Sequence, residues 1–432
     1  MSPQPALDSF LLYGVFGLLL FGPLAFGVRE PWSVFVLEAG AASLVVLWAW
    51  RQAASGELRV SGSPLFPPML AFAALILLQL ALGWTTYRYE TLSHLFLYCA
   101  YGALGFLLVQ CLRKAAQIKT LAIVLTAYGS VLALFAVMQS LGANSKLYWL
   151  RTPRFGGWIY GPYVNHNHYA GLMEMLVPIP LVLALTGYVR GRHKLLAAAA
   201  AAVMASTVFL SGSRGGMLAI AVEGVVLAAF LIKRQTGPRV ALALGVFLVI
   251  VVGMLTWLGG GELTKRMASI RSEAKAEISG GTRVAIDRDG LRMFAKKPVL
   301  GWGLGTFPEV YPQYRSFYTN FWVNAAHNDY VQLLVEMGAL GFAAMLWFVA
   351  VMYRSAAKKL NHWHSDLNGA IALAALLGCT GILVHSLLDY NLQIPANAAL
   401  FYAWSVLAAL EPRFAVSRRS RIPQPDLMQA SA

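Results

Sequence analysis

The feature that most constrains this chain is a succession of apolar runs, most of them close to the roughly 20 residues with which an α-helix crosses a bilayer. These runs predict membrane spans near 10–28, 32–50, 65–84, 92–112, 119–141, 168–189, 195–211, 215–232, 239–258, 328–353, 367–388 and 395–410. The composition agrees, because 58% apolar and 12% charged residues leave too little polar surface to solvate a water-soluble protein of 432 residues. Inside lipid every backbone N–H and C=O needs an internal partner, so we expect an all-α polytopic membrane protein with about 12 transmembrane helices.

Lysine and arginine gather in every second connection between the predicted spans. The clusters are Arg51 and Arg59; Arg113, Lys114 and Lys119; Arg190, Arg192 and Lys194; Lys233, Arg234 and Arg239; Arg354, Lys358 and Lys359; and Arg413, Arg418, Arg419 and Arg421. Because positively charged connections stay on the cytoplasmic side, both termini are predicted to be cytoplasmic. The first run lacks the basic start and the cleavage site of a removable signal peptide, so we expect it to remain as the first span.

This pattern divides the chain into five segments. They are N-terminal transmembrane helices at 1–142, central transmembrane helices with extracytoplasmic loops at 143–258, a large extracytoplasmic loop with amphipathic helices at 259–327, C-terminal transmembrane helices at 328–412 and a basic cytoplasmic tail at 413–432. Most of the net charge of +15 borders the cytoplasmic face, where anionic lipid headgroups attract it. Since no soluble basic domain is present, we expect membrane lipids and not nucleic acid as partners of these charges.

Two extracytoplasmic connections break the charge rule, and these exceptions point to function. The first, 143–168, carries Arg154 and leads into Asn165, His168 and Tyr169. These residues are expected to bind substrate, the polar side chains by hydrogen bonds to sugar and Tyr169 by stacking, or else to hold the loop. No metal is expected there, because histidines two residues apart diverge on a helix.

The second connection, 259–326, contains Arg288, Arg292 and Lys296 at four-residue spacing, which stacks them on one face of a helix. We expect this helix to lie along the membrane surface, either touching lipid phosphates at random or holding substrate through Arg288. Arg283 stands at the predicted start of the helix, where we expect a specific anion contact.

A further irregular stretch, Ser-Gly-Ser-Arg-Gly-Gly at 211–216, separates two apolar runs at the extracytoplasmic side. An arginine at that depth is costly without a partner. The glycines let the backbone approach a ligand closely, and the Arg214 guanidinium suits the two-pronged geometry of phosphate. A lipid-linked phosphate is therefore the predicted counter-ion. The alternative is a tight turn from which Arg214 reaches water.

A histidine motif closes the second connection. His327-Asn328 is followed, after nine residues, by Gly-x-x-Gly at 338–341. Upstream lie a proline- and glycine-rich run at 298–307 and a Gly-Thr-Arg stretch at 281–283. In this order the motifs resemble the signature of the O-antigen ligase family, which also includes O-antigen polymerases and some protein O-oligosaccharyltransferases. The first four spans match that family only in being hydrophobic.

This resemblance implies a glycosyltransferase of the all-helical, GT-C-like membrane class in the bacterial inner membrane, with its active site at the periplasmic face. Such an enzyme takes glycan from undecaprenyl diphosphate and transfers it with inversion to an acceptor hydroxyl, without nucleotide sugar, metal or other cofactor. The histidine motif favours a ligase with lipid A-core as acceptor. The alternative is a polymerase that accepts another lipid-linked glycan.

Attack of a hydroxyl on an anomeric carbon needs a base near the hydroxyl and cations that stabilise the departing diphosphate. His327 fits the base, since an imidazole titrates near neutral pH. Arg214 and Arg283 fit the leaving group and match the positions that the resemblance gives to essential arginines. In an alternative scheme a protonated His327 binds phosphate and Asp389 is the base. Asn328 and Asp389 are also candidates for binding substrate.

A transporter of lipid-linked glycan is a competing interpretation, because about twelve spans with buried polar residues is also a transporter layout. Two features argue against it. No motif is repeated between the two halves of the chain, and the polar residues gather at one predicted membrane face instead of at the midplane.

Overall fold

The computed structural model describes residues 4–142, 146–153, 158–186, 188–234, 282–319 and 322–410, with the single positions 237, 245, 249 and 253. The α-helices are α1 (Gln4–Leu24), α2 (Pro31–Ser55), α3 (Phe66–Ala81), α4 (Arg88–Cys111), α5 (Ala115–Leu141), α6 (His166–Leu176), α7 (Pro178–Leu185), α8 (Arg192–Ser211), α9 (Arg214–Lys233), α11 (Thr282–Lys296), α12 (Phe307–Val310), α13 (Asp329–Ala357), α14 (Leu367–His385) and α15 (Pro395–Ala409). Short 3-10 helices are η1 (Tyr311–Gln313), η2 (Leu360–His362) and η3 (Asn391–Gln393).

Nine spans among the described residues are long and apolar enough to cross a membrane, with α6 and α7 counted as one span. The helices α3 and α15 are shorter, at 16 and 15 residues. Together they correspond to every predicted span except 239–258, which lies outside the described residues apart from three single positions. The chain is an all-α polytopic membrane protein, as predicted, and the total of about twelve spans stays a prediction.

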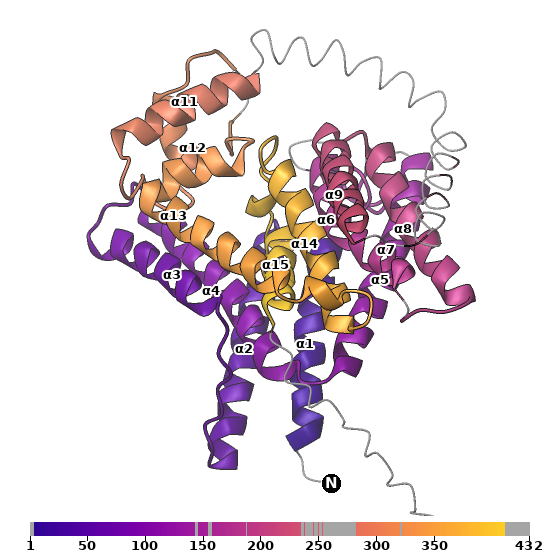
Figure 1. Cartoon of the computed structure of the whole chain (residues 1–432). Helices are drawn as coiled ribbons and strands as arrows, with labels where there is room; N and C mark the ends of the chain where they lie inside the picture. The colour runs from indigo at the N-terminus through magenta and orange to yellow at the C-terminus, as the bar shows by residue number, and fades with distance from the viewer. Residues whose placement is uncertain are drawn as a thin grey trace, which may run out of the picture.

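Helices α6, α7, α14 and α15 form the centre of the bundle. All residues of the α6–α7 span and 78% of those in the apolar part of α14 are buried inside the protein. The corresponding shares are 28% for α2 and 33% for α9. Every residue of α15 is buried as well. Figure 1 shows α14 between α15 and the magenta helices, and it packs against α6, α7, α9 and α15. Polar residues on α6 and α14 therefore lie in the interior and away from lipid.

Two of the predicted continuous spans are broken helices. The span at 168–189 divides into α6 and α7 where Pro178 and Pro180 remove backbone donors. The span at 328–353 breaks at Gly338, whose φ of 64° and ψ of −168° are not helical. An L-residue at Gly338 would also collide with the carbonyl of Val299. The predicted span is present, and the break within it was not predicted, because apolar character says nothing about a break.

The proline- and glycine-rich run at 298–307 packs into the break in α13. The Ala339 N–H donates to the Pro298 carbonyl at 2.8 Å, and the Trp302 N–H donates to the Val335 carbonyl at 2.9 Å. These bonds satisfy backbone groups that a kink would otherwise leave unpaired. The motif therefore has a structural task, which is to fasten the loop to α13.

Two buried side chains complete this fastening. The Glu336 carboxylate accepts the N–H groups of Gly305 and Phe307, at 2.9 and 3.3 Å. The Gln79 side chain on α3 donates to the Leu300 carbonyl at 2.5 Å and accepts the Leu304 N–H at 3.2 Å. The loop groups that bond to Glu336 and Gln79 are all neutral backbone groups, and these bonds attach the loop to both α3 and α13.

The segment from α11 to η1 forms a small cap on the start of α13, at the upper left of Figure 1. Its core contains Ile286 and Met293 of α11, packed with Val331 and Val335 of α13. On the opposite face of α11, the side chains of Arg288, Arg292 and Lys296 are exposed, which confirms the predicted basic face. The helix also begins at Thr282, so Arg283 lies in its first turn as predicted.

Candidate functional site

His327 lies immediately before the N-terminus of α13. Its φ of 57° is left-handed, a conformation that costs a residue other than glycine about 1–3 kcal/mol and often marks a functional position. Asn328 follows as the N-cap, and its side-chain oxygen accepts the N–H of Tyr330 at 3.1 Å. The cap fixes where α13 begins, and His327 lies directly before it.

Asp329 ties this end of α13 to the turn after α14. Its backbone N–H donates to the Ser386 carbonyl at 2.9 Å, and its carboxylate accepts the Ser386 hydroxyl at 2.7 Å. The same carboxylate oxygen accepts the Leu392 N–H at 3.0 Å. The turn that carries Asp389 is therefore held in a fixed position opposite His327.

Asp389 is the central residue of the site. The His327 Nδ1 lies 3.1 Å from Asp389 Oδ1, and the Tyr390 N–H donates to the same oxygen at 2.9 Å. The Asn167 side-chain amide donates to the other oxygen. The side chain of Asp389 is only 1% exposed, whereas that of His327 is 26% exposed. A buried carboxylate thus orients an imidazole that solvent or substrate reaches.

The charge state of Asp389 follows from these partners. Burial raises the pKa of the carboxyl, but the hydrogen bond and charge of His327, together with the charge of Arg283, lower it well below its usual range. Asp389 is therefore ionised at neutral pH. The ionised carboxylate beside Nδ1 fixes the orientation of the His327 ring.

Arg283 reaches this site from the first turn of α11. Its guanidinium donates to the Leu388 carbonyl at 2.7 Å and lies 3.7 Å from Asp389 Oδ2. Asp287, one turn later on α11, also faces the site. Burial raises its pKa, and interactions with Asn328, His327 and Arg283 oppose that rise. Thus α11 brings one cation and one further carboxylate to the histidine.

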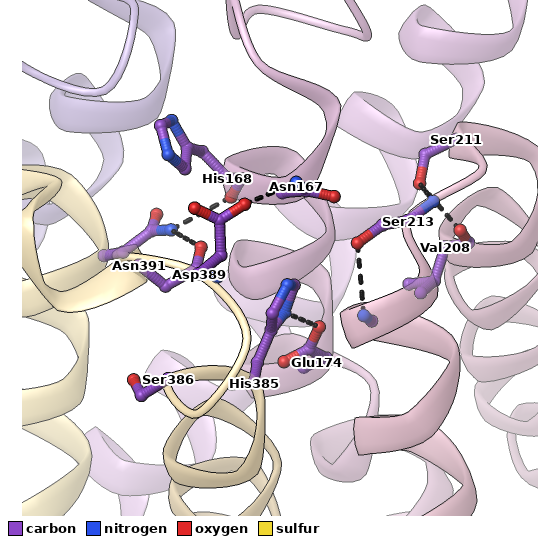
Figure 2. Close-up of polar contacts among 12 residues, drawn as sticks. Asn167, His168, Glu174, Val208, Ser211, Ser213, His385, Ser386, Asp389 and Asn391 are labelled. Atoms are coloured by element: carbon purple, nitrogen blue, oxygen red, sulfur yellow. Dashed lines mark hydrogen bonds and ion pairs between the residues drawn. The ribbon is translucent and has the colours of Figure 1, made fainter. Parts of the chain in front are cut away.

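Arg214 is the first residue of α9, next to the buried part of the site. Ser213 caps the helix by accepting the Gly216 N–H at 3.1 Å, as Figure 2 shows. A side chain at Gly215 would collide with the ring of His385, one helical turn before Asp389. The glycines that flank Arg214 therefore allow close packing of α9 on α14, and the same N-terminal turn carries the arginine.

Beneath the site, His385 and Glu174 form a fully buried pair, with Nδ1 and Oε1 2.7 Å apart (Figure 2). This pair joins α14 to α6. Nearer the site, the ring of Tyr390 meets the rings of His327 and His168 edge to face, each at 4.9 Å between centroids. The imidazole of His327 is thereby held on one side by a carboxylate and on another by an aromatic ring.

The other predicted substrate-binding residues differ in what surrounds them. The side chain of Asn165 caps α6 by accepting the Asn167 N–H at 2.8 Å. His168 is buried, with only 6% of its surface exposed, and its ring packs against Tyr390. Tyr169 is fully buried, and its hydroxyl donates to Thr207 at 2.9 Å, so the prediction that its ring stacks on glycan was wrong.

Two predicted residues stand apart from this cluster. Arg154 lies outside the described residues. Arg288 is exposed on the basic face of α11, and its role in binding substrate stays a prediction. The sequence interpretation overlooked Asp329 and Asp287. Asp287 and Asp329 were recognisable as acids within three residues of the predicted cations and histidine.

An apolar cavity of about 400 Å³ opens between α3, α4, α13 and α15. A smaller neighbouring cavity shares Tyr98, Met345 and Tyr402 with it and extends to Asp329 and Ser386. The two cavities share part of their lining, and the smaller one reaches the turn that carries Asp389. Space of this shape and character suits a lipid chain.

Residues 199–346 match the family model described as O-antigen ligase. This part of the chain is similar to the O-antigen ligase and polymerase superfamily. Members of this superfamily are membrane glycosyltransferase-like enzymes. The matched region includes Arg214, Arg283 and His327, while Asp389 and helices α1–α7 lie outside it. No curated protein matches the chain.

Proposed function

We propose that this protein is an O-antigen ligase of the bacterial inner membrane, with both termini cytoplasmic, which transfers glycan from undecaprenyl diphosphate to a lipid A-core hydroxyl at the periplasmic face. The observation that carries the proposal is the contact of a partly exposed His327 with a buried Asp389, to which Arg283 also extends. This arrangement provides an oriented base and a cation within one site.

His327 is the better candidate for the base. Its Nδ1 faces Asp389, which leaves Nε2 to accept a proton from the acceptor hydroxyl. Asp389 is 1% exposed, and both of its oxygens already accept hydrogen bonds, so a substrate hydroxyl has no access to it. Asp389 then acts as a positioning residue that favours the protonated form of the imidazole.

The reaction that follows is a single displacement. The acceptor oxygen forms a bond to the anomeric carbon from the face opposite the diphosphate, and the acceptor proton passes to His327 Nε2. The bond between the anomeric carbon and the phosphate oxygen breaks, and its electron pair leaves with undecaprenyl diphosphate. Arg283 and Arg214 carry permanent positive charge and stabilise the negative charge that develops on this leaving group.

The apolar cavities support a lipid-linked substrate. A polyprenyl chain has no polar groups, so it requires an apolar route that ends near the reacting diphosphate. The smaller cavity reaches Asp329 and Ser386, which hold the turn of Asp389 in place. A lipid seated along this route would present its headgroup to the cluster of His327 and Arg283.

Product analysis with the purified protein in detergent tests this proposal. Undecaprenyl diphosphate-linked glycan is supplied with lipid A-core, and separately without any second acceptor. We expect glycan on lipid A-core in the first mixture and no product in the second. Longer lipid-linked chains in both mixtures would identify a polymerase. With the protein reconstituted into vesicles, movement of intact donor across the membrane without release of undecaprenyl diphosphate would identify a transporter.

Variants connect the product to the site. His327→Ala, Arg214→Ala and Arg283→Ala are each expected to abolish most transfer. The matched control is His362→Ala, because His362 is an exposed histidine beyond the far end of α13. If the three site variants transferred glycan as well as this control, the site would lie elsewhere in the chain.

A further inference from the structure

The loop between α1 and α2 has a strained backbone. Three consecutive residues, Phe26, Gly27 and Val28, have left-handed φ values of 58°, 78° and 63°. Such a conformation is costly for a β-branched residue, and Val28 is also fully buried. A strained loop of this kind persists only when its surroundings hold it firmly, and it is often associated with function.

One side of the loop is fastened beside the candidate site. The Gly27 carbonyl accepts the N–H of Ala396 at 3.2 Å. A Cβ atom at Gly27 would lie 2.8 Å from the ring of Tyr163 and 2.9 Å from the side chain of Ile394. Ile394 follows Tyr390 by four residues, so the loop packs directly after the turn that contacts His327.

The other side of the loop is fastened to the segment at 146–153. Arg151 forms an ion pair with Glu30 at 2.8 Å and lies over the ring of Phe26 at 4.9 Å. The Tyr148 hydroxyl donates to the Leu24 carbonyl at 2.7 Å. The charge of Glu30 is therefore paired with Arg151, and the loop is held from both sides.

Arg29 extends from this rigid loop. It is exposed, and its side chain makes no hydrogen bond or ion pair with the part of the chain that the structure describes. Its charge nevertheless reaches the site. Burial raises the pKa of Tyr390, and the charge of Arg29 is the strongest influence against that rise. Tyr390 is the residue whose ring contacts both His327 and His168.

We propose that Arg29 is a further phosphate-binding residue of this site, contributed by N-terminal helices that the family match does not cover. Its ligand is the diphosphate of a lipid-linked donor or a phosphate of a lipid acceptor, so the inference rests on the proposed function. A guanidinium suits phosphate because it offers paired donors in a fixed plane. The strained loop holds the backbone of Arg29 in place before substrate arrives, which lowers the entropy lost on binding.

Binding of inorganic diphosphate to the full-length protein in detergent tests the inference without requiring glycan transfer. The variants are Arg29→Ala and Arg29→Lys. Arg88→Ala is the control, because Arg88 is another exposed arginine, at the start of α4. It lies two residues after Thr86, whose N–H donates to the Trp302 carbonyl in the loop at 298–307. We expect Arg29→Ala to weaken diphosphate binding about tenfold, Arg29→Lys to recover part of the loss, and Arg88→Ala to bind as the wild type does.

The binding of undecaprenyl diphosphate and of lipid A-core is then measured separately. The ligand that Arg29→Ala binds more weakly than the wild type does is the one that Arg29 contacts. Melting temperatures of the variants show whether the fold is intact. Unchanged diphosphate binding by Arg29→Ala, an equal loss in Arg88→Ala, or no diphosphate binding by the wild type would overturn the inference. A wild type that binds diphosphate through Arg29 but transfers no glycan would instead refute only the proposed function.

Discussion

Asp389, in the turn after α14, and Glu336, on α13, are both buried carboxylates, each 1% exposed, yet their surroundings differ. Glu336 accepts hydrogen bonds from neutral groups only, namely two backbone N–H groups and the Gln332 amide. Asp389 faces His327 and Arg283, which are charged or titratable and partly exposed. The difference teaches that burial of an acid does not by itself mark an active site.

The partners of each carboxylate explain its task. A carboxylate whose oxygens are satisfied by fixed neutral donors fastens one segment to another, as Glu336 fastens the loop at 298–307. A carboxylate that orients an accessible histidine prepares a group for proton transfer. On this account, substitutions around Asp389 affect the reaction, whereas substitutions around Glu336 affect stability.

The largest expected effect is that of His327→Gln. Glutamine is similar in size and polar, but it cannot take up a proton, so we expect the rate of glycan transfer to fall about thousandfold. The melting temperature should stay close to that of the wild type, because the histidine side chain is partly exposed. Transfer rates with saturating donor and acceptor measure the effect, and His362→Gln is the control. A rate within tenfold of the wild type would remove His327 from the mechanism.

Arg283→Ala should reduce transfer about a hundredfold, since loss of one group that stabilises developing charge commonly has that effect. Arg283→Lys should lie between the alanine variant and the wild type, because lysine retains the charge without the planar fork. Steady-state kinetics on both variants check this. Equal activity of the lysine and alanine variants would show that the charge of Arg283 does not matter.

Glu336→Ala should show the opposite pattern. The N–H groups of Gly305 and Phe307 would lose a buried acceptor, at a cost of about 1–3 kcal/mol each. We expect a melting temperature lower by about 4 °C or more, with transfer per folded molecule within about threefold of the wild type. A full loss of transfer in a protein that still melts at the wild-type temperature would break the comparison between the two carboxylates.

The smallest expected effect concerns pH. The pKa of Asp389 is lower in the folded protein than in the unfolded chain. The ionised carboxylate therefore adds to stability at pH values above the ordinary carboxyl pKa of about 4, and this contribution is lost as the pH falls toward the lower pKa of the folded protein. In His327→Ala the strongest influence that lowers this pKa is absent, so stability should be lost at a higher pH than in the wild type. Melting temperatures between about pH 7 and about pH 2 check this. Identical pH profiles would mean that His327 does not interact with Asp389.

Much of the fold was predictable from sequence because hydrophobic length and helical periodicity are local properties. The predicted spans other than 239–258 correspond to described helices, and the basic face of α11 is confirmed. The breaks at Pro178 and Gly338 were not predicted. A glycine within an apolar run can pack or kink, and only the insertion of the loop at 298–307 decides between these outcomes.

The site was predictable as a set of residues but not as an arrangement. His327 and Asp389 are 62 positions apart, and no local pattern says that they touch. The charge rule that singled out Arg283 applies equally to Arg29, in the first predicted extracytoplasmic connection, but one arginine in a short connection gives a weak signal. Tyr169 shows the opposite error, since polar neighbours in sequence suggested an accessible ring that tertiary packing buries.

The most direct test of the account is a double-mutant cycle on the transfer rate, with His327→Gln, Asp389→Asn and the double variant. If Asp389 acts only by positioning His327 and stabilising its charge, Asp389→Asn should slow transfer by a hundredfold or more in the wild type and hardly at all when His327 is absent. If instead the two losses multiply, Asp389 has its own task in the reaction. That result would contradict the assignment of His327 as the base that Asp389 supports.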